Sequence, residues 1–302
     1  MKKTTPDDVK SAVETALSSG NIDAENSEIA FFGGSFTAID REYMVSLLNA
    51  AKAYVGYFKG IRISTRPDCI DDIILEILKG YKVTAIELGA QSMCDEVLCL
   101  NDRGHDSEAV RKAAELIKSK GFSLGLQMMT GLYGSSYEKD IFTASEFIKL
   151  APDTVRIYPT VILKNTKLEQ LFLGGEYKPD TVEYSVDLCA ELIRMFEKAD
   201  INVIRVGLHS SETMENSMLA GAYHPAFREL CESKIYYELL TEKLNKEKIK
   251  RGNITAFVAK SAVSKLIGQR KSNLTKLKEK GYNVNVLADE TLSERQIIIQ
   301  EG

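Results

Sequence analysis

Six short apolar segments, rich in β-branched residues, are separated by helical patterns along the first two thirds of the chain. The apolar segments lie at residues 29–32, 61–65, 83–88, 124–129, 154–158 and 203–206. The helical patterns lie at about 41–57, 69–79, 107–119, 137–150 and 181–199. Because the apolar segments are near-continuous rather than alternating, they predict strands buried on both faces, in a parallel sheet covered by helices. This order of elements is typical of a doubly wound sheet or of a barrel.

Polar and glycine residues gather directly after these strands. They lie at residues 33–35, 64–66, 89–92, 131–134 and 159–160. Active sites lie at the carboxyl ends of the strands in both layouts, and contributions from several strands favour the mouth of a barrel. Neither a GxGxxG fingerprint nor a GxxxxGK[ST] loop occurs, so the common nucleotide-binding folds lose their main support.

The composition is that of an ordinary globular chain, with 302 residues, 44% hydrophobic and 27% charged. No apolar run approaches the roughly 18 residues that a membrane span needs, and the polar start MKKTTPDDVK lacks the apolar core of a signal peptide. The cysteines Cys69, Cys94, Cys99, Cys189 and Cys231 are irregularly spaced. We therefore expect a reduced, cytoplasmic protein without a disulfide framework or a membrane contact.

Charge is distributed unevenly along the chain. The net charge is −4, but residues 241–280 carry 12 Lys and Arg against 3 Asp and Glu. A basic segment on an acidic body favours a polyanionic partner for that segment, whereas a solvated pair of lysine-rich helices explains the charge equally well.

The chain begins with a helix rather than a strand. Thr5-Pro6-Asp7-Asp8 combines a capping residue, a proline at the first helical position and acids in the first turn, and the helical pattern continues to about Leu17. A parallel α/β unit normally opens with a strand. Either the first strand is absent or an extra helix precedes the unit.

The last third of the chain has a different pattern. Strands are expected at 253–259, 282–287 and 295–300, and one helix at 261–280. The run Leu266–Asn273 within that helix weakly resembles the GXXG clamp of a KH-type RNA module, but Lys271 stands where the second glycine would be. A continuous helix is the preferred interpretation.

Several stretches together resemble the radical S-adenosylmethionine (SAM) family, in the bacterial branch similar to elongator protein 3 and the oxygen-independent coproporphyrinogen oxidases. The matching stretches are AFFGGSFTAID, RISTRPDCI, AIELGAQSMCDEVL, NDRGH, LGLQMMTGLYG, VRIYPTVILKNTKLE and VIRVGLHSSE. The resemblance implies an α/β fold, a partial (β/α)6 TIM-like barrel that lacks its first strand, with a small α+β C-terminal unit. The expected domains are 1–215, the partial barrel, and 216–302, a helical and β-α-β-β basic unit.

The family's cofactors are SAM and a [4Fe–4S] cluster held by three cysteines in a CxxxCxxC loop. Together they yield a 5′-deoxyadenosyl radical that abstracts hydrogen. This sequence contains no CxxxCxxC, and its closest pair, Cys94 and Cys99, falls where the family has no ligand. We therefore expect no metal ligand in this chain and infer that the family's N-terminal cluster segment is missing from it.

The resemblance also implies a set of site residues. Gly33 and Gly34 are expected to offer their backbone to the methionine ammonium, Arg66 and Arg103 to approach its carboxylate, and Gly131 to approach the adenine. Hydroxyl and amide groups for the ribose are expected from Ser64, Gln91 and Gln127, and Ser35 is expected to bind the cofactor at the position where many relatives have Glu. Residues assigned to substrate or RNA are Arg156, Tyr158, Arg270 and Lys271.

Three further residues are interpreted as structural. Glu87 is expected inside the barrel, and because a buried carboxylate needs a partner, Arg62 or Arg156 is predicted to supply one. His105 and His209 lie at matching family positions but are assigned to no metal.

The leading hypothesis is a radical SAM enzyme core that is active when a cluster-binding segment is present, with RNA or tRNA held through residues 241–280. The alternative is an inactive SAM- or RNA-binding fragment without a cluster, and tetrapyrrole oxidation has less support. Loss of the first strand would expose the edge of strand 29–32, so self-association is also predicted.

Overall fold

The structure is a computed structural model that describes residues 3–209 and 212–302. It divides into two compact units. The first, here called the sheet unit, comprises the described residues up to Tyr158 together with Ala199–Ile204. The second, here called the C-terminal unit, comprises Pro159–Lys198 and the described residues of Arg205–Gly302. Each unit is described by itself.

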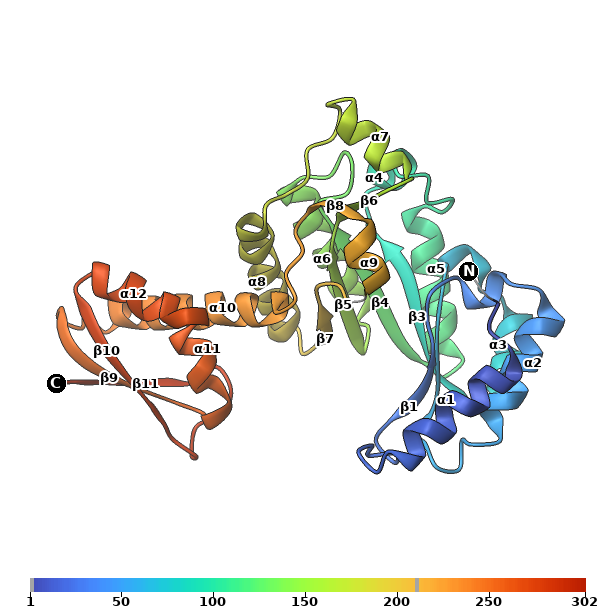
Figure 1. The fold of residues 1–302 in the computed structure, drawn as a ribbon, viewed down its shortest axis with the longest axis horizontal. Helices are drawn as coiled ribbons and strands as arrows, with labels where there is room; N and C mark the ends of the chain where they lie inside the picture. Colours follow the sequence, from blue (N-terminus) through green and yellow to red (C-terminus); the bar gives the residue numbers. More distant parts are fainter. Residues whose placement is uncertain (1–2, 210–211) are drawn as a thin grey trace. The chain divides into compact units, whose positions relative to one another are not determined.

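A six-stranded sheet with the order β1-β2-β3-β4-β5-β7 is the centre of the first part of the chain (Figure 1). Its strands are β1 (Glu28–Phe31), β2 (Gly60–Thr65), β3 (Val83–Gln91), β4 (Ser123–Thr130), β5 (Thr154–Pro159) and β7 (Asn202–Val206). The pairs β1–β2, β2–β3 and β3–β4 are parallel. The sheet curls into an open half-barrel, which confirms the predicted partial TIM-like fold.

Burial on both faces explains why the sequences of the strands are continuous apolar runs. Successive residues of a strand point to opposite faces, and successive residues are buried at Ile63 and Ser64 of β2 and at Glu87 and Leu88 of β3. Figure 1 shows α5 running beside β3 and β4 as part of the helical cover. The prediction of a helix-covered parallel sheet is therefore confirmed at these strands.

Five helices of the sheet unit begin at residues whose side chains cap the first turn. Thr5 and Asp8 form a capping box at the first helix, and Asp40, Asp71, Asp106 and Ser136 each accept a hydrogen bond from the first turn of a later one. The elements are α1 (Pro6–Ser18), η1 (Phe36–Ala38), α2 (Arg41–Lys52), η2 (Pro67–Cys69), α3 (Asp72–Gly80), α4 (Asp95–Leu100), α5 (Ser107–Ser119) and α6 (Tyr137–Leu150).

The C-terminal unit contains two small sheets. A pair of short antiparallel strands, β6 (Val161–Leu163) and β8 (Met218–Gly221), forms one of them. The other has the order β10-β9-β11, with β9 (Gly252–Val258) parallel to β10 (Tyr282–Ala288) and antiparallel to β11 (Ile297–Glu301). The helices are α7 (Lys167–Leu173), α8 (Val182–Lys198), α9 (Glu212–Ser217) and α10 (Phe227–Lys246), and after β9 come η3 (Lys260–Ala262), α11 (Val263–Ile267), η4 (Gln269–Lys271) and α12 (Ser272–Glu279).

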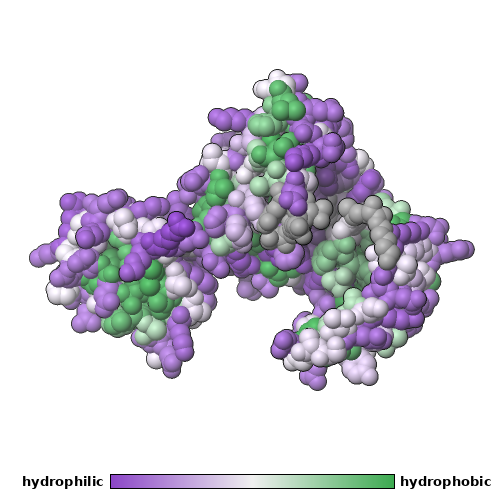
Figure 2. Space-filling model, viewed as in Figure 1, coloured by the Kyte–Doolittle hydropathy of each residue, from purple (hydrophilic) through white to green (hydrophobic). Residues whose placement is uncertain are grey.

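The three-stranded sheet has a core of its own. Tyr236 and Leu240 of α10, Ala256 of β9 and Leu277 of α12 are all completely buried in one cluster. The opposite face of this sheet presents an apolar row, because Leu287 and Ile298 are both in register with Phe257, and Figure 2 shows a hydrophobic area over these strands.

One sequence prediction for this unit is wrong. A single helix was expected at 261–280, but the helix ends at Ile267 and restarts at Ser272. Between them Gly268, Arg270 and Lys271 have φ values of 77°, 52° and 63°, which no continuous right-handed helix can contain. No helix in the described part of the chain is both long enough and apolar enough to cross a bilayer.

Candidate functional site

Hydroxyl groups join the loop after β1 to the end of β2. The Ser35 hydroxyl accepts a hydrogen bond from the backbone N–H of Arg66 at 2.8 Å and lies 3.2 Å from the Thr65 hydroxyl. The Thr65 hydroxyl lies 2.6 Å from that of Thr37, which also donates to the carbonyl of Cys69 at 2.6 Å. Because Thr37 and Thr65 are buried, these bonds fix the loop against the neighbouring strand end.

The two glycines of that loop border open space. Gly33 has a φ of 105°, a conformation that favours glycine, and neither Gly33 nor Gly34 has a heavy atom within 4 Å of the position a Cβ would take. Both are exposed. Their backbone is therefore accessible to a ligand, and no neighbouring protein atom explains the absence of side chains.

A buried carboxylate lies at the centre of the sheet. Glu87 of β3 is 1% exposed, and it accepts hydrogen bonds from Arg156 Nε and Nη2 of β5 at 2.6 and 3.0 Å. Arg62 Nη1 of β2 lies 3.3 Å from the same carboxylate, and Arg62 Nε donates to Glu28 of β1 at 2.6 Å. The predicted partners of Glu87 are confirmed, and both arginines take part.

Gln127 connects this network to Ser64. Its Nε2 donates to Glu87 Oε2 at 2.8 Å and to the Ser64 hydroxyl at 3.1 Å. Burial opposes the charge of Arg156, but its hydrogen bonds to Glu87, the charge of that carboxylate and Tyr158 together outweigh burial, so the pKa of Arg156 is raised. The network thus holds its donors and acceptors in fixed positions across five neighbouring strands.

Arg156 also faces an exposed aromatic ring. Its guanidinium carbon lies 4.7 Å from the ring centroid of Phe32, which is 48% exposed and directly precedes Gly33. Arg156 further interacts with Tyr158 on the same strand. Two predicted substrate residues are therefore adjacent to each other and to the glycine loop.

A second polar cluster follows β2 and α4. Arg66 Nε donates to Asp68 at 2.9 Å, and this hydrogen bond raises the pKa of Arg66 and lowers that of Asp68. Burial, and then the Asp68 carboxylate, raises the pKa of the Cys69 thiol. A thiol with a raised pKa stays protonated at neutral pH and is a poor metal ligand.

Arg103 has spare hydrogen-bonding capacity in this cluster. Its Nε is buried without a partner among the described residues, and burial, followed by the nearby Arg66, lowers its pKa. The Nε2 of His105 lies 3.2 Å from the Ala90 carbonyl oxygen, which can only accept a hydrogen bond, while its Nδ1 is buried and unpartnered within the described chain. Arg103 and His105 line an open cleft of about 900 Å³ together with Asp68 and Asp95. The cleft is also lined by Asp102 and Asp106, so the buried, unpartnered Nε of Arg103 is the group in it that is suited to an anion.

Gln91 and Gly131 complete the predicted set in the sheet unit. Gln91 ends β3 with a φ of 67° and is 8% exposed, and its Nε2 lies 2.8 Å from where a Cβ of Gly89 would be. Gly131 donates its N–H to Asp140 Oδ2 at 3.0 Å, which ties the loop after β4 to α6. Arg270 and Lys271 belong to the C-terminal unit.

Several residues of the site escaped the sequence analysis. Thr37, Asp68 and Asp140 hold loops rather than expose functional groups, and Glu28 lies at the start of its strand instead of the end. Polar residues one or two positions beyond a strand end are a signal that would have identified Asp68. Among the described residues, no three His, Cys, Asp or Glu side chains gather in a way that could hold a metal ion.

Two family models match the chain. The model described as the radical SAM superfamily matches residues 1–145, and the one described as the radical SAM C-terminal domain matches residues 152–237. Together they span most of the chain, and the first contains the glycine loop, Glu87, Gln127 and Arg103.

Curated proteins also match parts of the chain. The tRNA uridine(34) acetyltransferase of Methanocaldococcus infernus is 38% identical over 133 residues, which are 42% of this chain and 24% of that protein. Elongator complex protein 3 of Schizosaccharomyces pombe is 35% identical over 140 residues, 45% of this chain and 26% of that protein. An uncharacterized protein of Methanocaldococcus jannaschii is 34% identical over 155 residues, 50% of this chain and 48% of that protein. The matches span about half of these relatives' length or less.

Solved structures share the fold. The archaeal Elp3 of M. infernus with an N-terminal deletion aligns with a TM-score of 0.66 and 24% identity, over 82% of this chain and 62% of that chain. SuiB of Streptococcus suis bound to S-adenosylmethionine aligns with a TM-score of 0.51 and 16% identity, over 69% of this chain and 44% of that chain. Both likenesses concern the fold alone.

Proposed function

Because the chain belongs to the radical SAM superfamily, we propose that its sheet unit binds S-adenosylmethionine and that the complete protein acts on RNA, with tRNA as the favoured class. The observation that supports this proposal most strongly is the glycine loop after β1. It offers exposed backbone at Gly33 and Gly34, and it is fixed to β2 by Ser35. The tRNA assignment is supported by the elongator-like relatives, one of which is a tRNA uridine acetyltransferase.

The groups present fit the parts of SAM. Carbonyls of the Gly33–Gly34 backbone suit the methionine ammonium, and the buried, unpartnered Nε of Arg103 suits its carboxylate. Hydroxyl and amide groups of Ser64 and Gln127 suit the ribose. In this superfamily the bound SAM supplies a 5′-deoxyadenosyl radical, and the role of these residues is to bind and orient it.

The cysteines of this chain do not fit the ligand set of the family's [4Fe–4S] cluster. The sequence contains no CxxxCxxC, Cys189 and Cys231 are buried, and burial raises the pKa of Cys69. We therefore derive no step through the cluster. The proposed SAM binding does not depend on the cysteines, because it is assigned to Gly33, Gly34 and Arg103.

The glycine loop allows a direct test of SAM binding. Gly34→Val adds a branched side chain where nothing lies within 4 Å, so the fold should be preserved while close approach of a ligand to the backbone is blocked. Gly56→Val is the matched control, because Gly56 likewise has open space around it and does not need a positive φ. Isothermal titration with SAM should show an affinity weakened by a factor of about ten or more for Gly34→Val, and an unchanged affinity for Gly56→Val. Equal affinities in the two variants would refute the assigned site.

A second candidate function is a SAM- or RNA-binding protein without radical chemistry. It is favoured by the lack of a grouped set of cysteine ligands among the described residues. Anaerobic reconstitution with iron and sulfide separates the two candidates. Retention of iron and sulfide in equal amounts, followed by SAM cleavage, supports the enzyme, whereas SAM or RNA binding without retained iron supports the binding protein.

A further inference from the structure

The turn between α11 and α12 has a strained backbone at two cationic residues. We call residues 268–271 the GQRK turn. Gly268 has a φ of 77°, and Arg270 and Lys271 have φ values of 52° and 63°. Left-handed backbone is unfavourable for side chains other than glycine, and it persists only where the surrounding structure holds it.

A buried asparagine holds this turn in place. Asn273 is 3% exposed, and its Nδ2 donates to the Ser233 carbonyl at 2.9 Å, the Ser233 hydroxyl at 3.0 Å and the Leu266 carbonyl at 3.1 Å. Gly268 is packed so closely that a Cβ would lie 2.6 Å from the Ser272 hydroxyl. The GQRK turn is therefore a fixed projection rather than a frayed helix end.

The cations of the turn are unpaired. Gln269, Arg270 and Lys271 are exposed, and no side chain in the described part of the protein pairs with Arg270 or Lys271. Lys265, one helical turn earlier, is instead held near Glu294 at 3.3 Å. The charges of Arg270 and Lys271 therefore have no counter-charge within the described part of the unit.

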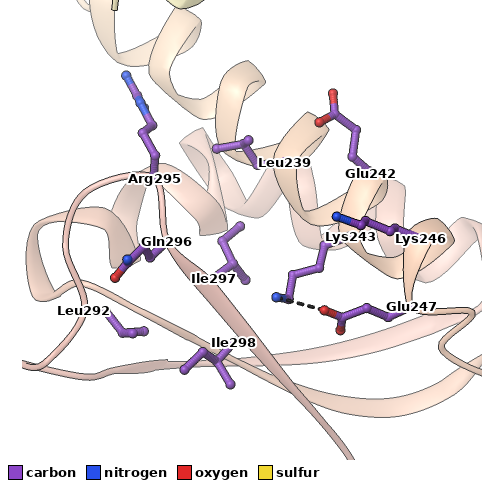
Figure 3. Close-up of a pocket in the computed structure, with 10 residues that line it drawn as sticks. All are labelled: Leu239, Glu242, Lys243, Lys246, Glu247, Leu292, Arg295, Gln296, Ile297 and Ile298. Carbon is purple, nitrogen blue, oxygen red and sulfur yellow. Dashed lines mark ion pairs between the residues drawn. The ribbon is translucent and has the colours of Figure 1, made fainter. Parts of the chain in front are cut away.

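The other concave surface of this unit is a weaker candidate for an anion. A cleft of about 530 Å³ lies between α10 and the start of β11 (Figure 3). Two of its three cations are already neutralised, because Lys243 pairs with Glu247 at 2.9 Å and Arg295 pairs with Glu232 at 2.7 Å, which leaves Lys246. A polyanion would have to break these pairs, whereas the GQRK turn offers its charges directly.

We propose that the GQRK turn clamps the phosphodiester backbone of single-stranded RNA. A glycine turn that presents backbone and basic side chains to four backbone nucleotides is the clamp of GXXG-type RNA modules. Arg270 provides a planar fork that suits a phosphate, and Lys271 adds a second cation in place of a second glycine. Exposed lysines along α12, Lys276, Lys278 and Lys280, extend the positive surface.

This inference extends the proposed function, by naming how an RNA partner is held, and it is tested independently of SAM. Fluorescence anisotropy with the full chain would measure binding of a labelled single-stranded RNA of mixed sequence, and of the same strand in a duplex, over a salt series. We expect Arg270→Gln with Lys271→Gln to weaken single-strand binding about tenfold. The slope of log affinity against log salt should become less steep by about 0.7 for each lost phosphate contact.

Lys248→Gln with Lys250→Gln is the matched control. It removes the same charge from two exposed, unpaired lysines of the described chain. The N–H of Gly252 donates to the carbonyl of Gly281, which follows the C-terminal end of α12. Lys248 and Lys250 therefore lie near the end of α12 that is farther from the GQRK turn, and that helix is about 12 Å long. The control should lower the affinity about twofold or less, because the Debye length is only about 10 Å.

Lys271→Gly separates binding from folding. Glycine accepts the left-handed backbone without strain, so the melting temperature should rise while the RNA affinity falls. Equal losses in the double variant and its control, an unchanged RNA affinity in the double variant, or tighter binding of the duplex would each overturn the proposal. The SAM affinity of the same variants should match that of the parent. Loss of RNA binding in a variant that still binds SAM therefore bears on this inference alone. Absence of SAM binding in the parent protein bears on the proposed function instead.

Discussion

Arginine has opposite roles in the two units. In the sheet unit, Arg62 and Arg156 point into the strand network and are neutralised by Glu87, a carboxylate that is 1% exposed. In the C-terminal unit, Arg270 stands on an exposed turn and pairs with no side chain among the described residues. The same guanidinium thus serves as a fixed internal donor in one place and as an available surface charge in the other.

The difference follows from solvation. A buried charge loses its hydration, so it is retained only with a partner, and removing that partner is strongly destabilising. An exposed charge keeps its water and can exchange it for a phosphate. We therefore expect changes in the network to affect folding first, and changes in the GQRK turn to affect binding first.

The largest expected effect on stability is at Glu87. Glu87→Gln keeps the shape of the side chain but leaves Arg156 without its buried counter-charge and Arg62 with Glu28 alone, so the free energy of unfolding should fall by about 3–5 kcal/mol. Urea unfolding followed by circular dichroism measures it. Glu76→Gln, which removes an exposed partner of Lys120, should change stability by about 1 kcal/mol or less. A similar small change at Glu87 would contradict the distinction between the two regions.

Gly268 should show the next largest effect. Gly268→Ala places a Cβ 2.6 Å from the Ser272 hydroxyl, on a backbone with a φ of 77°, so we expect a loss of about 1–3 kcal/mol in stability. Gly56→Ala, made in open space, should be neutral or slightly stabilising. Thermal unfolding of both variants would compare them, and equal melting temperatures would mean that the GQRK turn is not held as described.

The C-terminal unit should also have its own alkaline limit. Burial, together with the hydrogen bond to Glu294, raises the pKa of Tyr236 from 10.0 to about 12. The folded protein keeps this phenol proton at pH values where the unfolded chain releases it. The stabilisation is therefore complete below pH 10 and declines between about pH 10 and 12, by up to about 1.4 kcal/mol per pH unit.

Tyr236→Phe is the variant that tests this pH dependence. It should flatten the decline in unfolding free energy above pH 10, even though it lowers stability by removing the hydroxyl bond to Glu294 at 2.9 Å. The exposed Tyr57→Phe should leave the slope as it is. An unchanged slope in Tyr236→Phe would assign the alkaline limit to another group.

The smallest effect is expected at β1, an edge of the six-stranded sheet. β1 is an edge strand of only four residues, and unpaired strand edges favour association. We predict weak, concentration-dependent self-association, which Ala30→Lys should reduce because Ala30 is exposed on that strand. Ala38→Lys, exposed but outside the strand, is the control. Sedimentation profiles that are equally monomeric for the parent and both variants would reject this prediction.

The strands and most helices of the sheet unit were predictable because their signals are local. Near-continuous apolar runs marked β2 and β3, and the capping residue Thr5 marked the start of α1. The pairing of Glu87 with Arg62 and Arg156 was predictable for a related reason. A charged residue inside an apolar strand must be buried, and a buried carboxylate requires a cation on a neighbouring strand.

Weak local signals explain the elements that were missed. β6 and β8 have three and four residues, and they pair across more than fifty intervening positions. Their short apolar runs cannot be distinguished from loops by periodicity. The same reason applies to α4 and α7, whose six and seven residues are too few to establish a helical pattern.

The sequence by itself determined where the parallel sheet, its glycine loop and the basic segment lie, because periodicity, capping and charge are properties of neighbouring residues. Only the tertiary structure decided the break at Gly268. Leu266 and Leu277 keep a helical apolar spacing across it, so the pattern favoured one helix. The break depends on Asn273 bonding to Ser233, 40 positions earlier in the chain, and contacts between distant residues form only once the helices have packed together.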